Sequence, residues 1–203
     1  MTHRLPFVVI AACLLFSAAC KKSNNNGNAG PNPLTGTSWN VEGETTSADV
    51  TSTATFGPLS VTVINLIDFH TIDNTGTISF TSDSLNATGV GYSIDTSYTS
   101  ITQTPVSSDT IISPLATTVP PGNASFSYKL IGQDSIYFPN GSPIALNVDS
   151  IQPPIEAKGA HFTINGTTLT ITSTINQSGN ETVNGITAPT TGTIRSVITL
   201  SKQ

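Results

Sequence analysis

Apolar and polar side chains alternate along most of the chain from residue 34 to its end. In "TTLTITSTI" (167–175), Leu169, Ile171 and Ile175 fall on one side of an extended chain, and threonines fall on the other. A period of two predicts strands with one buried and one solvated face, as in antiparallel sheets. β-Branched residues dominate, and no stretch has the apolar spacing of a helix. The pattern predicts an all-β fold.

Turn residues divide these alternating runs into successive strands. Asn165-Gly166 stands between two such runs, which is the strongest short-range signal for a hairpin. The segment 104–123 is rich in proline and polar residues, and we expect it to leave the sheet as a long excursion at one end. Strands are predicted near residues 37–43, 49–56, 59–70, 76–82, 88–99, 124–131, 135–138, 144–151, 160–164, 167–176 and 193–201. Such a succession favours a meander that closes into a barrel or folds as a sandwich.

The first twenty residues have a different pattern. A basic start (1–4) is followed by twelve apolar residues (5–16) and then by small residues. This is the order of a secretory signal, and twelve residues are too few to cross a bilayer as a helix, which needs about 20. The segment resembles a bacterial lipoprotein signal, and the resemblance implies that Cys20 carries a diacylglycerol as the new N-terminus. The alternative is an ordinary cleaved signal with a chance cysteine.

A lipidated cysteine explains why the apolar run stops there. Two or more acyl chains anchor a protein stably, so only a solvated tether needs to follow. We therefore expect a signal peptide over residues 1–19, a lipidated cysteine and flexible tether over 20–33, and a β-domain over 34–203. The protein would be attached to a membrane of the cell envelope by its N-terminal lipid. Residue 21, directly after the cysteine, is a lysine and not an aspartate, which favours the outer membrane. The sequence does not decide between the periplasmic and the surface face of that membrane.

The composition excludes several classes of function. Only 9% of the residues are charged and the net charge is −5. Nucleic-acid binding needs clustered cations, whereas the domain has four scattered ones, Lys129, Lys158, Arg195 and Lys202. Both cysteines lie in the first twenty residues, so the domain has no disulfide or cysteine-based metal site.

The two ends of the domain carry a family resemblance. "LTGTSWNVEG" (34–43) has a lone tryptophan, Trp39, shortly after Gly36, and "TIRSVITLSK" (193–202) closes the chain. This pattern resembles the lipocalin signature, especially in the lipocalin-like domains of bacterial lipoproteins. The resemblance implies an antiparallel, up-and-down, eight-stranded barrel with room for one small ligand. It also implies that Trp39 packs beneath Arg195. A β-sandwich is the alternative fold.

A lipocalin-like barrel would bind a small apolar or amphipathic ligand through its inward-facing side chains. The alternating runs supply candidates for this lining, namely Ile78, Phe80, Phe126, Tyr128, Leu169 and Ile171. The same side chains would look identical in sequence if they filled the barrel of a structural or protein-interaction module. Trp39 itself is more simply a core residue, with Arg195 as a stacking partner.

The sequence offers little for catalysis. A Gly-x-Ser-x-Gly elbow is missing, and neither His70 nor His161 has a metal-type partner at short spacing, so we expect no enzyme, metal or cofactor. Both histidines are expected at strand ends. Glu42 and Glu44 are expected to share one solvated face of the first strand.

Four tripeptides share an aspartate, a hydroxyl residue and an apolar residue. They resemble the acceptor motif of a periplasmic O-glycosylation system of some Gram-negative bacteria. An aspartate at a turn, followed by a β-former, also starts a strand without any modification. The sequence leaves the two interpretations open for the tripeptides that begin at Asp83, Asp109, Asp134 and Asp149.

Overall fold

The computed structural model describes residues 32–140, 145–146, 155–183 and 186–203. Within these ranges the chain forms strands and turns and no helix, so the predicted all-β class is confirmed. No described segment is therefore a helix that could cross a membrane. The strands are β1 (Ser38–Phe56), β2 (Leu59–His70), β3 (Ile72–Phe80), β4 (Ser84–Gln103), β5 (Ser108–Ser127), β6 (Lys129–Ile131), β7 (Ser135–Tyr137), β8 (Ala145–Leu146), β9 (Ile155–Glu156), β10 (Gly159–Asn165), β11 (Thr168–Val183) and β12 (Ile186–Lys202).

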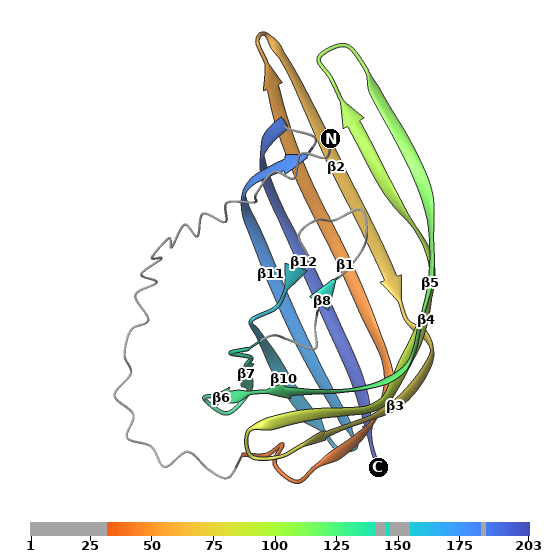
Figure 1. Ribbon diagram of the computed structural model, residues 1–203, viewed down its shortest axis with the longest axis vertical. Helices are drawn as coiled ribbons and strands as arrows, with labels where there is room; N and C mark the ends of the chain where they lie inside the picture. Colours follow the sequence, from red (N-terminus) through yellow and green to blue (C-terminus); the bar gives the residue numbers. More distant parts are fainter. Residues whose placement is uncertain (1–31, 141–144, 147–154, 184–185) are drawn as a thin grey trace, which may run out of the picture.

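The strands form an antiparallel meander that is rolled into a barrel. β1 pairs with β2 and β3 on one side and with the last strand, β12, on the other. From β12 the sheet continues through β11, β10, β7 and β6, and from β3 it continues through β4 to β5. The described residues thus form a 10-stranded sheet, more than the eight strands expected, and β8 and β9 pair separately. In Figure 1 the long strands run side by side and bend round at the end where the C-terminus lies.

The expected excursion at 104–123 is wrong, because most of it forms β5. This strand pairs with β4 from Ser108 opposite Gln103 to Ser127 opposite Ser84. Proline lacks the N–H that a central strand needs, but an edge strand tolerates it. β5 is such an edge in the described part of the sheet, since β4 is its only partner there. Proline therefore marked an edge strand and not a loop.

Other local predictions are confirmed in part, and several strands are longer than expected. The hairpin at Asn165-Gly166 forms, but Asn165 pairs with Thr168 and the loop is Gly166-Thr167. The two strands predicted at 37–43 and 49–56 are one strand, β1. Most of the strand predicted at 144–151 lies outside the described residues.

Two of the four Asp-hydroxyl-apolar tripeptides start strands in the expected way. Ser84 begins β4 and donates a hydrogen bond to the carboxylate of Asp83, 3.1 Å away. Ser135 begins β7 and makes the same contact with Asp134, also at 3.1 Å. The tripeptide at Asp109 lies in the exposed edge strand β5, and the one at Asp149 lies outside the described residues.

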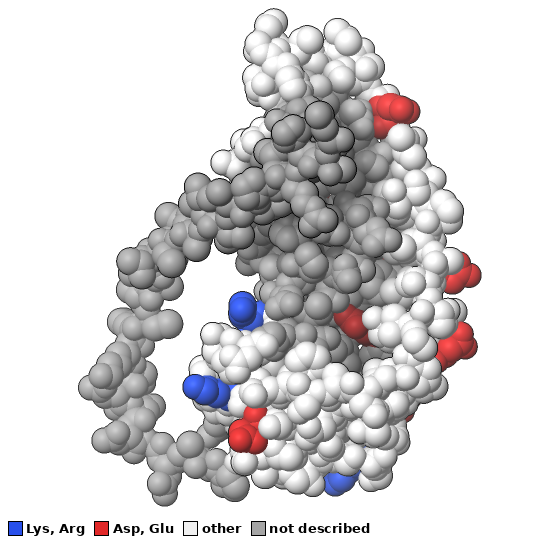
Figure 2. Space-filling view, in the orientation of Figure 1, with Lys and Arg blue, Asp and Glu red and all other residues white. Residues whose placement is uncertain are grey.

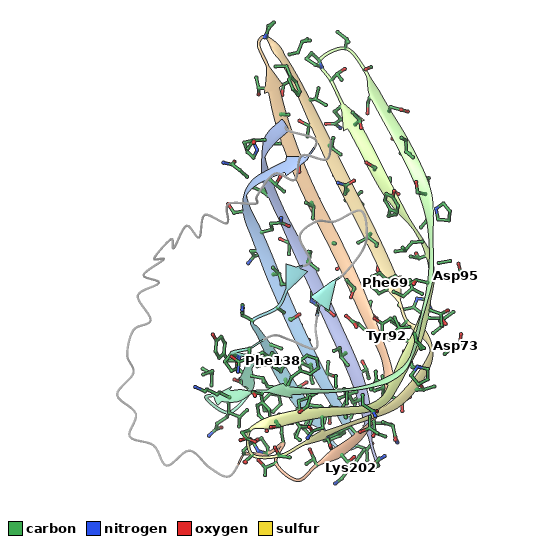
Figure 3. All side chains as sticks on the ribbon, viewed as in Figure 1. Phe69, Asp73, Tyr92, Asp95, Phe138 and Lys202 are labelled. Atoms are coloured by element: carbon green, nitrogen blue, oxygen red, sulfur yellow. The ribbon has the colours of Figure 1, made fainter. Side chains whose placement is uncertain are left out.

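Buried apolar side chains form two clusters inside the barrel. The base cluster lies at the bent end and contains the largest buried side chains, among them Trp39, Phe80, Tyr128 and Phe138. The rings of Phe80 and Tyr128 meet edge to face, with centroids 5.8 Å apart. The smaller upper cluster lies further along the long strands and consists of Ala48, Ile67, Phe69 and Ile194. Figure 3 shows the side chains crowded at the base and sparse toward the hairpin tips.

Candidate ligand-binding pocket

A pocket of about 300 Å³ lies between the two ends of the barrel. This volume is at the lower end of the range for small-molecule sites. In Figure 3, Tyr92, which lines the pocket, lies where β4 bends, between Phe69 of the upper cluster and the crowded base. Its lining comes from five strands, β1, β3, β4, β5 and β12, and from the segment that joins β2 to β3. The lining residues are Val41, Gly43, Glu44, Thr71, Asn74, Ile78, Leu85, Ala87, Val90, Tyr92, Val119, Pro120, Gly122, Asn123, Ala124, Phe126 and Ile198.

The predicted lining residues divide between the pocket and the base. Ile78 and Phe126 line the pocket. The other four do not line it and are at most 2% exposed in the base cluster, to which Ile78 also belongs: Phe80, Tyr128, Leu169 and Ile171. The alternation in the sequence identified inward-facing positions, but it could not show which of them border the pocket and which are packed on all sides.

The expected contact of Arg195 with Trp39 is wrong. Trp39 is 2% exposed in the base cluster, and the β1–β12 register places it opposite Lys202. Arg195 lies seven residues away along β12, opposite Ser47, with its side chain exposed. At about 3.3 Å per residue this is more than 20 Å. The indole nitrogen of Trp39 instead donates to the hydroxyl of Thr37 at 2.8 Å, so Trp39 is a core residue with a local partner.

Gly36, the remaining residue of the expected signature, belongs to the turn before β1. It has a φ of +76°, which suits glycine. Its N–H donates to the carbonyl of Phe80 at 2.8 Å. Gly36 therefore ties the start of the domain to the end of β3 and does not reach the pocket.

The expectation that Glu42 and Glu44 share a solvated face is wrong, because a β-bulge separates them. Pairing with β12 shifts register between Val41 and Gly43, so Glu42 is the extra residue. Beyond a bulge, the alternation of faces is offset by one residue. Glu42 stays exposed and accepts a hydrogen bond from Ser201, whereas Glu44 turns into the barrel and lines the pocket.

Two side chains hold this bulge, Thr71 between β2 and β3 and Asn74 within β3. The hydroxyl of Thr71 accepts a hydrogen bond from the backbone N–H of Glu44 at 2.8 Å, and the N–H of Thr71 donates to the Glu44 carbonyl at 2.8 Å. The side-chain amide of Asn74 donates to the carbonyls of Glu42 and Thr71, each at 3.0 Å. Asp73, between them, takes a φ of +53° at this break in the strand. The bulge is therefore fixed from the neighbouring strand.

The carboxylate of Glu44 is oriented by two buried hydroxyls. Its Oε1 accepts a hydrogen bond from Thr46, at 3.0 Å, and another from Ser196. Thr46 and Ser196 are register partners on β1 and β12, and both are at most 4% exposed. In the described part of the chain no donor reaches Oε2. Glu44 thus presents one oxygen that remains able to accept a hydrogen bond.

Tyr92 is the second polar group in this part of the pocket. Burial, and then the negative charge of Glu44, raise the pKa of Tyr92 above its ordinary value of 10.0. The phenol therefore stays protonated at physiological pH and beyond. It adds a neutral hydroxyl to a wall that is otherwise mostly aliphatic.

The basic residues of the β-domain do not line the pocket. The four cations of the β-domain are all exposed, and none is among the residues that line it: Lys129, Lys158, Arg195 and Lys202. In Figure 2 the described part of this face carries few charged side chains, and several of the acidic ones lie along the right-hand edge, on the β4–β5 side.

Both histidines of the β-domain are exposed. His70 ends β2 and is exposed. His161 is the third residue of β10, and its Nδ1 lies 3.7 Å from Asp134 with both side chains more than half exposed. The described residues contain no group of three or more His, Cys, Asp and Glu side chains that could hold a metal ion.

Cys20 and the tether predicted for residues 20–33 fall largely outside the described residues, which begin at Asn32. Comparisons of the chain with protein-family models, with characterised proteins and with solved structures found no match.

Proposed function

We propose that this protein is a lipid-anchored lipoprotein of the cell envelope whose lipocalin-like barrel binds a small, mainly apolar ligand. The observation that carries the binding function is the pocket of about 300 Å³, whose walls are mainly apolar and whose polar side chains include Glu44 and Tyr92. Burial would drive binding, at about 25 cal/mol for each Å² of apolar surface removed from water. The anchor rests on the sequence that ends at Cys20.

A substitution that fills the pocket tests the binding function. Ala87 lines the pocket from β4, so Ala87→Phe would occupy the space that a ligand needs. We expect 1-octanol, added to the full chain and followed by calorimetry, to bind the variant at least tenfold more weakly. Thr88→Phe is the control, because the next residue on a strand faces the other side and Thr88 is exposed. Equal octanol binding by the parent and Ala87→Phe would contradict the assignment of this pocket.

The lipid anchor is tested separately in a Gram-negative host. Cys20→Ser removes the sulfur that would carry the lipid, and we expect the protein to leave the membrane fraction. Cys13→Ser is the control, since Cys13 lies inside the apolar run of the signal and would be removed with it. Cys20→Ser protein that still sediments entirely with membranes would contradict lipid anchoring.

A module for protein interaction is the second candidate. It is favoured by the filled base and by exposed apolar side chains at the hairpin tips: Phe56 ends β1, Leu59 begins β2, and Val106 lies between β4 and β5. If native mass spectrometry of protein from its host shows no co-purifying small molecule, and octanol does not bind, this candidate replaces ligand binding.

A further inference from the structure

The pocket contains one charged group, and its sign restricts what it can bind. Resting on the binding function proposed above, we infer that the pocket selects ligands with a protonated amine on a small apolar body and discriminates against carboxylates. The head group would meet Glu44, and the body would lie against the aliphatic wall. A fatty acid is therefore the wrong kind of ligand for this barrel.

The first argument is the state of the Glu44 carboxylate. Thr46 and Ser196 already donate to Oε1, and both donors are buried, so the group cannot turn away easily. No described donor reaches Oε2. A partly buried carboxylate with unused acceptor capacity gains most from a donor that is itself charged. A ligand ammonium would supply both the hydrogen bond and the counter-charge.

The second argument is that the other polar groups in the pocket are largely occupied. The hydroxyl of Thr71 is bonded to the backbone of Glu44, and the amide of Asn74 is bonded to two carbonyls. The side-chain oxygen of Asn123 accepts from the N–H of Gly89 at 2.8 Å. The remaining amide atoms of Asn74 and Asn123 are uncharged, so Glu44 is the one charged side chain of the lining that could orient a charged head group, with Tyr92 in the same lining.

The third argument is the absence of a counter-charge for an anion. All four cations of the domain are exposed and do not line the pocket. A bound carboxylate would lose its hydration and face the like charge of Glu44 without compensation, which is costly in a partly desolvated site. Binding of fatty acids would require a basic residue that this pocket lacks.

The pocket also limits the size of the ligand. At roughly 30 Å³ for each water-sized atom, a volume of about 300 Å³ holds on the order of ten non-hydrogen atoms. Octylammonium, 1-octanol and octanoate all fall near this size. They share one chain and differ in the charge of the head group, so they separate the effect of charge from the effect of burial.

The experiment measures the binding of these three compounds to the full chain by calorimetry near neutral pH. We expect octylammonium to bind about 10- to 100-fold more tightly than octanoate, as charged hydrogen bonds do, with octanol between them. In the Glu44→Gln variant, the affinity for octylammonium should be within about threefold of the affinity for octanol. Glu42→Gln removes an equal charge from the exposed side of the bulge, and it should leave the preference unchanged.

The outcomes distinguish this inference from the function on which it rests. Binding of octanol together with equal or tighter binding of octanoate than of octylammonium would overturn the charge preference and leave a pocket for apolar ligands. A preference retained in Glu44→Gln, or lost in Glu42→Gln, would also overturn it. Failure of all three compounds to bind would overturn the ligand pocket itself. If Glu44→Gln does not fold, the affinities of the three compounds for the unaltered protein still test the charge preference.

Discussion

The base of the barrel and the hairpin tips belong to the same sheet but are stabilised in different ways. β1 begins at the base, where Trp39 is 2% exposed, and ends at a tip, where Phe56 is 47% exposed. Near the tips the strands are joined by ladder hydrogen bonds and by hydroxyl pairs across strands, such as Ser52 with Thr190 at 2.8 Å and Thr53 with Thr62 at 3.1 Å. Such pairs contribute only about 0.2–1 kcal/mol each.

This difference shows how a chain with few aromatic residues divides them. Only 6% of the residues are aromatic, and the fully buried ones gather at the base. The large apolar side chains at the tips are left in water, with Val106 92% exposed. We infer that most of the folding free energy is localised at the base, and that the pocket borders this packed end, since Ile78, Leu85 and Ile198 belong to both.

The largest expected effect compares the two aromatic residues at the ends of β1. Trp39→Ala would leave a large cavity in the base cluster and cost about 3–5 kcal/mol of unfolding free energy. Phe56→Ala, at the tip, should change it by no more than about 0.5 kcal/mol. Urea denaturation of both variants measures this. Similar losses from the two would mean that stability is not concentrated at the base.

A second pair of substitutions compares glycines of positive φ in the two regions. A Cβ at Gly76, in β3, would lie 2.5 Å from backbone atoms of Gly89 and Val90. Gly76→Ala should therefore cost about 3 kcal/mol or more, because backbone must move. Gly57, at the tip of the β1–β2 hairpin, has a φ of +60° and open space around it. Gly57→Ala should cost only the backbone strain, about 1–2 kcal/mol. A milder loss at Gly76 than at Gly57 would contradict the close approach of β3 and β4.

Most of this fold could be predicted from the sequence, because alternation, β-branched residues and Asn-Gly turns act locally. Residues 59–70 were predicted as a strand, and β2 has the same bounds. The edge strand β5 was missed because proline has the same local meaning in a loop and at a sheet edge. Only the pairing with β4 distinguishes the two, and this pairing joins residues far apart in the chain.

The candidate site was less predictable than the fold. Alternation placed Ile78 and Phe126 on the inner face correctly, but it could not show that these two border the pocket whereas Leu169 and Ile171 do not. Glu44 was missed as a pocket residue because a one-residue bulge reversed its face. The contacts that hold this bulge come from Thr71 and Asn74, about thirty residues away, so a strand pattern read by itself gives no signal for it.

Thr71 provides a test of whether the bulge that orients Glu44 depends on its contact with the segment between β2 and β3. Thr71→Val keeps the shape of the side chain but removes the acceptor for the N–H of Glu44. An N–H left without its partner should cost about 2 kcal/mol, within the usual range for such groups. The same variant should bind octylammonium more weakly, because Glu44 loses its fixed position. Thr88→Val on the exposed face of β4 is the control, and equal losses in the two variants would show that the bulge does not depend on Thr71.

The smallest expected effect concerns Tyr92, at the boundary between the two regions. Its pKa is raised above 10.0 by burial and then by the charge of Glu44. Below about pH 9 the phenol is protonated in both the folded and the unfolded chain, so it adds no pH dependence. Above this range the unfolded tyrosine loses its proton first. The folded state then binds more protons than the unfolded state, and stability falls as the pH rises.

Tyr92→Phe removes this contribution, so its unfolding free energy should fall less than that of the parent between about pH 9 and pH 11. Tyr137→Phe is the matched control, because Tyr137 lies on β7 with 41% of its side chain exposed and does not line the pocket. Urea denaturation at the two pH values measures how far the unfolding free energy of each variant falls. If Tyr92→Phe and Tyr137→Phe lose stability equally, Tyr92 is as solvated as a surface tyrosine, and the pocket is wetter than its aliphatic lining implies. A smaller loss in Tyr92→Phe alone places the dry part of the site next to Glu44, where a bound cation would be desolvated.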